Sequence, residues 1–232
     1  MFLNPDENLD LLSSSCHMSI ELDDKGHSSL ISICIDGNIL WLQDYITKYD
    51  KHTLQQHINF RAQNGKTALY VSCSQGYSDI VRMLLEHGAD PNISLNDGTT
   101  PLMIACQKNH QGCIYHLLNN IDIKIDINAI RNTGVTALMI AAMNGHLTIS
   151  EMLISHGANV NLKSQNGFTA LAYGCYSKSS SILLIKLLIR NGSDINWRKP
   201  IGQNLVSICR YTDVHNYLIS LGLKDEDRCI IL

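Results

Sequence analysis

Short apolar runs separated by glycine-containing polar turns recur along this chain, and residues 133–166 show the pattern most clearly. This unit has a turn at Gly134 and an apolar run that opens at Leu138. After a second turn it continues with a run that carries Leu147, Ile149, Met152, Leu153 and Ile154, and Gly157 follows. The spacing predicts two short helices, the second ended by a left-handed glycine. Neither helix is long enough to be stable alone in water, so the unit is expected to stack on copies of itself.

Copies of this unit are present along most of the chain. The leucine that opens each first helix recurs with successive spacings of 39, 33, 36, 33 and 34 residues, at Leu30, Leu69, Leu102, Leu138, Leu171 and Leu205. Similar Gly-containing segments close the second helices at residues 88–92, 157–161 and 192–196. The pattern predicts about six helix-turn-helix repeats over residues 25–222, with boundaries at 25–63, 64–96, 97–132, 133–165, 166–200 and 201–222.

The period, the Thr-x-Leu helix starts and the Gly-Ala-Asp-x-Asn closing sequence resemble the ankyrin repeat. The resemblance implies an all-α ankyrin-repeat solenoid of about six stacked repeats with β-hairpin-like turns. It also implies a protein partner on the concave face and no catalysis. One departure is that the proline of the family's Thr-Pro-Leu-His motif is present only at Pro101, and its histidine is replaced in every repeat.

Several segments depart from the regular period. Residues 1–24 are predicted to form a capping segment, an interpretation favoured over a faint resemblance of residues 3–7 to the start of an F-box. Extra residues around 47–56 predict a longer second helix or a loop. Isoleucine alternates with polar residues between 121 and 127, which predicts an extended segment with one buried face. The serine-rich residues 177–181 predict a loop, and residues 223–232 a C-terminal tail.

Composition gives no sign of nucleic-acid binding, and the cysteine positions favour an intracellular protein. The net charge of −3 and the pI near 6.3 give no electrostatic argument for nucleic acid binding. Five cysteines lie four residues after the anchor leucines, at Cys34, Cys73, Cys106, Cys175 and Cys209. We interpret them as reduced, buried packing residues, which implies a cytosolic compartment. A metal site is the competing interpretation, and the absence of a Cys-x-x-Cys pair disfavours it.

No catalytic motif is recognisable, and we expect no catalytic residue, cofactor or metal. No phosphate-binding glycine loop, Gly-x-Ser-x-Gly or His-Glu-x-x-His sequence is present. His87 and His156 each stand next to the closing glycine of a second helix, where a cation is favourable. A structural role is therefore expected for both.

The resemblance places the partner-binding surface at the turns and at the ends of the first helices. The positions that it indicates are polar in repeats two and three, and apolar or aromatic in repeats four to six. The predicted partner-binding residues are Val135, Met143, Phe168, Tyr176, Ile201 and Tyr211. Exposed aromatic and methionine side chains are typical of interface hot spots. The alternative is that the repeat-five insertion turns these side chains into the core.

The sequence ends with Cys229-Ile230-Ile231-Leu232, which matches the CaaX prenylation signal. The final leucine favours a geranylgeranyl-type prenyltransferase as a partner. One lipid gives weak membrane association. The alternative is that these residues fold back onto the last repeat.

The leading hypothesis is a non-catalytic adaptor in the eukaryotic cytoplasm, with a membrane-associated fraction if Cys229 is prenylated. Alternatives are a soluble inhibitor or regulatory subunit of an enzyme, and an effector that an intracellular bacterium secretes and its host prenylates. We expect a monomer.

Overall fold

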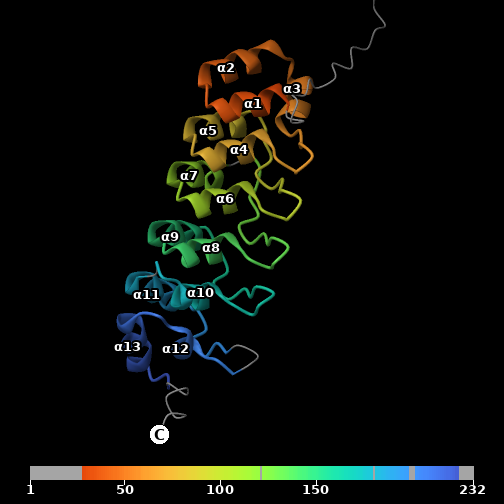
Figure 1. The fold of residues 1–232 in the computed structure, drawn as a ribbon. Helices are drawn as coiled ribbons and strands as arrows, with labels where there is room; N and C mark the ends of the chain where they lie inside the picture. Colours follow the sequence, from red (N-terminus) through yellow and green to blue (C-terminus); the bar gives the residue numbers. More distant parts are fainter. Residues whose placement is uncertain (1–27, 121, 180, 199–201, 225–232) are drawn as a thin grey trace, which may run out of the picture.

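The computed structural model describes residues 28–120, 122–179, 181–198 and 202–224, and within these ranges the chain forms thirteen helices and no strand. The helices stack in chain order into a single column (Figure 1). Inner helices contact one another in series, and outer helices cover one side of them. The predicted all-α ankyrin-repeat solenoid is confirmed.

The column has two rows of helices. The inner row consists of α1 (Ser29–Asp36), α4 (Ala68–Gln75), α6 (Pro101–Lys108), α8 (Ala137–Asn144), α10 (Ala170–Tyr176) and α12 (Leu205–Ile208). The outer row consists of α2 (Ile39–Lys48), α5 (Ser78–Glu86), α7 (Gln111–Leu118), α9 (Leu147–Ser155), α11 (Ile182–Arg190) and α13 (Thr212–Ser220). The remaining helix, α3 (Lys51–Ile58), follows α2.

The inner helices begin and end with the same local chemistry. A threonine hydroxyl accepts a hydrogen bond from the third helical N–H at Thr67, Thr100, Thr136 and Thr169. This bond satisfies an N–H group that the helix itself leaves without a partner. Left-handed residues end four of these helices: Gly37, Gly76, Asn109 and Gly145.

Hairpin-like turns connect each outer helix to the next inner helix, and they project from the column on the side away from the outer helices (Figure 1). Four of these turns are closed by an N–H to carbonyl bond across four residues, such as Leu95 N to Thr99 O at 2.9 Å. At Gly98, φ is +82° and an added Cβ would lie 2.9 Å from the Cα of Arg131 in the next turn. The recurring glycine therefore serves both the turn and the close stacking of neighbouring turns.

A ladder of asparagine side chains links successive repeats at the closing segments. Asn59, Asn92, Asn128 and Asn161 each accept a hydrogen bond from a backbone N–H about one repeat further on, at 2.7–2.9 Å. Three of them also donate to a carbonyl of the next repeat: Asn59 to Gly88, Asn92 to Lys124 and Asn161 to Gly192. The ladder thus provides hydrogen bonds between repeats in a chain that lacks the family's motif histidine.

The segments that depart from the regular period differ from one another in structure. Residues 47–56 form neither one long helix nor a loop, because Asp50 accepts bonds from His52 N and Thr53 N and starts the separate helix α3. That prediction was wrong. The isoleucine segment is non-helical and alternates as predicted: Ile123 is half-buried, whereas Asp122 and Lys124 are exposed.

The serine-rich segment is bound to the stack at both ends. Ser177 is buried and donates to the Met143 carbonyl in the preceding repeat. Ser181 caps the start of α11. Part of the predicted loop therefore belongs to the helix termini.

Four of the five repeat-position cysteines are buried as predicted, at Cys34, Cys73, Cys106 and Cys175. Burial raises the pKa of Cys34 to about 12, so that thiol stays protonated at neutral pH. Cys209 is half-buried, because α12 ends one residue before it. None of the helices in the described part of the chain has the length and apolar character that a bilayer crossing requires.

Candidate protein-interaction surface

A groove of about 490 Å³ lies between the last two inner helices, α10 and α12. Its apolar lining comes from Phe168, Tyr173, Tyr176 and Ile208, and Asn166 and Gln203 contribute amides. Cys209 and Arg210 border it from the residues that follow α12. We call this site the C-terminal groove.

The aromatic side of the C-terminal groove is built on a buried tryptophan. Trp197 is 1% exposed, and its indole N–H donates to the Gly167 carbonyl at 2.7 Å. The Phe168 ring packs against the Trp197 ring at 5.2 Å between centroids and against Tyr173 at 5.2 Å. Tilted ring pairs at such distances are favourable. Phe168 is therefore half-buried and fixed in place.

Tyr176 is the most exposed ring of the C-terminal groove, at 46%. The Tyr176 and Phe168 rings lie nearly perpendicular, at 81°, with their centroids 6.1 Å apart. The Arg210 guanidinium lies 4.3 Å from the Tyr176 ring centroid, a cation–π geometry. The groove thus combines an aromatic surface with one positive charge on its border.

The structure brings four of the six predicted partner-binding residues to the exposed or half-buried surface of repeats four to six. Met143 is 43% exposed at the end of α8, one repeat before Tyr176. Tyr211 is 40% exposed, and its hydroxyl donates to the Lys178 carbonyl. Phe168 is half-buried, so only part of its ring is available.

Val135 does not belong to this surface. Its side chain is 6% exposed within the core. The prediction of an exposed Val135 was wrong, because this side chain is buried in the core, whereas the larger Phe168 at the equivalent position is only partly buried. Ile201 and Cys229 lie outside the described residues.

Sequence reasoning missed Tyr173, Trp197 and Arg210. Arg210 stands five residues after Leu205, as Tyr176 stands five after Leu171, so the repeat register could have identified it instead of Tyr211. Trp197 directly follows the closing segment 192–196, at the position that holds Phe60, Ile93, Ala129 and Leu162 after the corresponding asparagines of the other repeats. A single tryptophan in that register was a usable signal.

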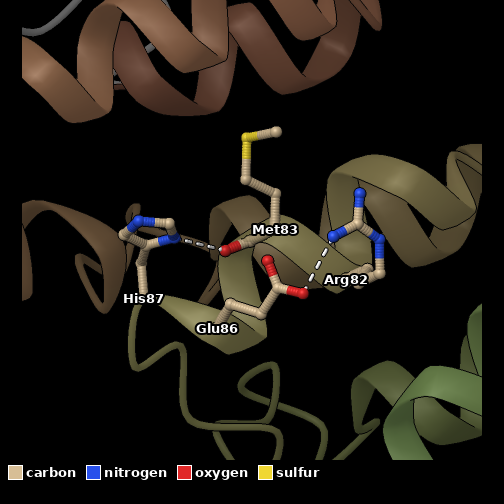
Figure 2. A network of polar contacts seen from close by, with 4 residues as sticks. All are labelled: Arg82, Met83, Glu86 and His87. Atoms are coloured by element: carbon tan, nitrogen blue, oxygen red, sulfur yellow. Dashed lines mark hydrogen bonds and ion pairs between the residues drawn. The ribbon is translucent and has the colours of Figure 1, made fainter.

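A larger groove of about 790 Å³ lies on the outer side, between α3, α5 and the segment after α7. Figure 2 shows the end of α5 on its border, where Arg82 pairs with Glu86 at 2.8 Å and His87 Nδ1 donates to the Met83 carbonyl at 2.8 Å. His156 makes the same contact with the Met152 carbonyl. The structural role predicted for both histidines is confirmed. The lining of this groove includes Asn59 and His87, whose side chains already have hydrogen-bond partners within the fold.

The described residues hold no cluster of three or more His, Cys, Asp or Glu placed to bind a metal ion.

Comparison with known proteins agrees with this architecture. A family model described as ankyrin repeats (3 copies) matches residues 4–94, 41–130 and 123–199. The putative ankyrin repeat protein FPV031 of Fowlpox virus is 38% identical over 173 residues, which cover 70% of this chain and 50% of that protein. Palmitoyltransferase AKR1 of Lachancea kluyveri is 33% identical over 162 residues, 68% of this chain but 22% of that protein.

A third relative, the B-cell lymphoma 3 protein homolog of Mus musculus, is 24% identical over 189 residues, 80% of this chain and 41% of that protein. The chain spans half or less of the length of these relatives. The family model covers most of the chain, and the stacked helix pairs have the matching architecture. This chain belongs to the ankyrin repeat family.

Proposed function

We propose that this chain is a protein-interaction module whose partner binds on repeats four to six, at Met143, the C-terminal groove and Tyr211. The single observation that supports this is the aromatic groove itself. Partly exposed rings supported by a buried tryptophan resemble the rigid anchors of binding hot spots. The equivalent inner-helix positions of repeats two and three are the polar Ser74 and Gln107.

The test replaces Tyr176 by alanine and measures capture of cellular partners by the immobilised full chain, with quantitative mass spectrometry. Because Tyr176 is exposed, we expect the circular dichroism spectrum and the thermal midpoint to stay unchanged while specific partners are lost. Tyr115→Ala is the matched control, since Tyr115 is a 57% exposed tyrosine on the outer helix α7. Equal retention of partners by both variants would contradict the proposal.

We propose prenylation of Cys229 as a second element of this function, for a chain in which Leu232 is the final residue. The supporting observation is the Cys-Ile-Ile-Leu sequence. A eukaryotic cytoplasmic location with a membrane-associated fraction is part of the same proposal. Intact-mass measurement on protein from eukaryotic cells tests it, because an unmodified Cys229 rules the lipid out. Fractionation of Cys229→Ser against the wild type then separates an anchored adaptor from a soluble inhibitor.

A further inference from the structure

Charged side chains are divided unevenly between the two sides of the column. We define the hairpin side as the turns and inner helices, described residues 28–38, 61–76, 94–109, 129–145, 162–179 and 197–211. This side carries eight Lys or Arg and two Asp. The other described residues form the outer side, with seven Lys or Arg and ten Asp or Glu. The hairpin side is therefore positive, although the whole chain has a net charge of −3.

The cations of the hairpin side are distributed along most of the column. Five lie in the turns, at Arg61, Lys66, Arg131, Lys163 and Arg198, and three at the ends of inner helices or directly after them, at Lys108, Lys178 and Arg210. Six of the eight are exposed, and Lys66 and Arg131 are half-buried. A partner approaching the turns therefore meets positive charge from the second repeat to the last.

The two acids of the hairpin side do not cancel this charge. Asp36 lies at the end of α1, in the first repeat. Asp97 accepts a hydrogen bond from Thr99 N at 2.9 Å, which together with the charge of Arg131 holds the pKa of Asp97 below its ordinary value. The Asp97 carboxylate thus stays negatively charged, and the positive charge of Arg131 partly offsets it. Lys108 shares its repeat with Asp97. Among the described residues of the hairpin side, repeats four to six contain no Asp or Glu, so acidic residues of this side do not offset the charges of Lys163, Lys178 and Arg210 there.

The positive side and the C-terminal groove are continuous through Arg210, which belongs to both. Successive repeats are about 8–10 Å apart, since that is the separation of packed helices. An extended chain advances ~3.3–3.6 Å per residue. A carboxylate at about every third residue of an extended peptide would therefore meet the cations of successive repeats.

We propose that the hairpin side binds an extended acidic segment of a partner protein, with its carboxylates along the turns and one apolar or aromatic side chain in the C-terminal groove. This inference rests on the interaction function proposed above and adds the chemistry of the partner. Opposite charge on the two surfaces increases the association rate and selects against basic partners.

Nucleic acid is the competing polyanion, and the groove disfavours it. Single-stranded nucleic acid binds by stacking bases on open aromatic faces. Here the Arg210 guanidinium covers one face of Tyr176, and Phe168 packs against Trp197 and Tyr173. The groove is better shaped for a side chain that inserts between ring edges.

The test measures fluorescence anisotropy of a labelled peptide of about a dozen residues, the length that spans roughly four repeats. The peptide carries Glu at about every third residue, with Leu and Phe among the residues between, and a second peptide has Gln in place of Glu. We expect the full chain to bind the Glu peptide at least about tenfold more tightly at ~50 mM salt. The difference should shrink at ~500 mM salt, because the screening length falls to a few ångströms.

Charge-reversal variants show which side of the column binds the Glu peptide. Lys163→Glu with Lys178→Glu should weaken Glu-peptide binding by about tenfold, since both side chains are exposed on the hairpin side. The matched control is Lys124→Glu with Arg190→Glu, which changes the same charge on the outer side and should leave affinity unchanged.

Equal affinity for the two peptides, failure of both to bind, or an equal effect of the two double variants would overturn the proposal. So would tighter binding of a single-stranded DNA oligonucleotide of the same charge. If the Glu preference is absent while Tyr176→Ala still loses its cellular partners, only the acidic partner is wrong and the interaction function stands.

Discussion

Repeats two and three differ from the last two repeats in how neighbouring turns are held together. In the former, side chains bond to the backbone of the adjacent turn: Arg61 donates to the Ser94 carbonyl at 3.0 Å and Asn96 to the Gln63 carbonyl at 2.9 Å. In the latter, Trp197 also donates to the backbone of the preceding turn, at the Gly167 carbonyl, but its ring is buried against Phe168 of that turn. The scaffold is therefore stabilised by polar contacts alone between the turns of repeats two and three, and by aromatic packing in addition at the last two repeats.

This difference has a functional consequence. Polar contacts between turns use small and flexible side chains, and the inner-helix ends beside them carry Ser74 and Gln107. Aromatic packing leaves ring edges at the surface, and in the last repeats these edges line the C-terminal groove. Packing that stabilises the end of the column thus also forms its most distinctive surface.

The strongest test of this comparison is Trp197→Ala. We expect a loss of about 3–5 kcal/mol in unfolding free energy, because the side chain is fully buried and supports Phe168. Urea unfolding measures the loss. The control is Ile130→Ala, an apolar side chain in the turn before α8 that is 59% exposed, which should change stability by no more than about 0.5 kcal/mol. Similar losses in the two variants would show that the aromatic cluster has no special role.

A smaller effect is expected from alanine at two glycines that end inner helices. Gly145 and Gly76 have φ of +74° and +85°, so each substitution costs about 1–2 kcal/mol in backbone strain. At Gly145 the new Cβ would also meet the backbone carbonyl of Ser179, whereas at Gly76 it would meet the His110 side chain, which can move. We expect Gly145→Ala to be the more destabilising variant by about 1 kcal/mol or more. Thermal unfolding of the two variants measures this difference. A lower stability of Gly76→Ala than of Gly145→Ala would contradict the packing of residues 177–179 on repeat four.

Periodicity predicted the repeat architecture because each helix pair reuses the same leucine, threonine and glycine positions. These positions serve local needs, namely a buried side chain, an N-cap and a left-handed turn, so they are visible in sequence. The separate helix α3 was not predicted, because its start depends on one capping residue, Asp50, within an otherwise polar stretch.

The candidate site was only partly predictable. Tyr176 and Met143 follow from the repeat register, but exposure at the Val135 position depends on side-chain size and on the neighbouring turn. The contact of Arg210 with Tyr176 joins residues from two repeats, after helix α12 ends early. No period within the sequence encodes that contact.

The asparagine ladder allows a test of the polar half of the column. Asn92 accepts from Asp126 N at 2.7 Å and donates to the Lys124 carbonyl at 3.1 Å, at an exposed site. Asn92→Ala should lower the unfolding free energy by about 1 kcal/mol, the usual net value for such bonds. Asn216→Ala, at an exposed position of α13, should cause no loss. Equal unfolding free energies of the two variants in chemical denaturation would mean that the ladder does not contribute to stability.

The last test concerns the reactivity of the cysteines rather than stability, because the cysteines occupy one repeat position in both halves of the column. Cys34 is fully buried with its pKa raised to about 12, whereas Cys209 is half-buried on the border of the C-terminal groove, and its pKa is raised by partial burial. Thiolate content and access together set the rate of alkylation. With iodoacetamide at pH 8, peptide mass mapping should therefore show Cys209 modified on the order of a hundredfold faster than Cys34. The Glu peptide, seated in the groove, should slow Cys209 without affecting the core thiol. Protection of neither thiol would place the peptide elsewhere on the column, and equal rates would mean that Cys209 is packed as tightly as its counterparts.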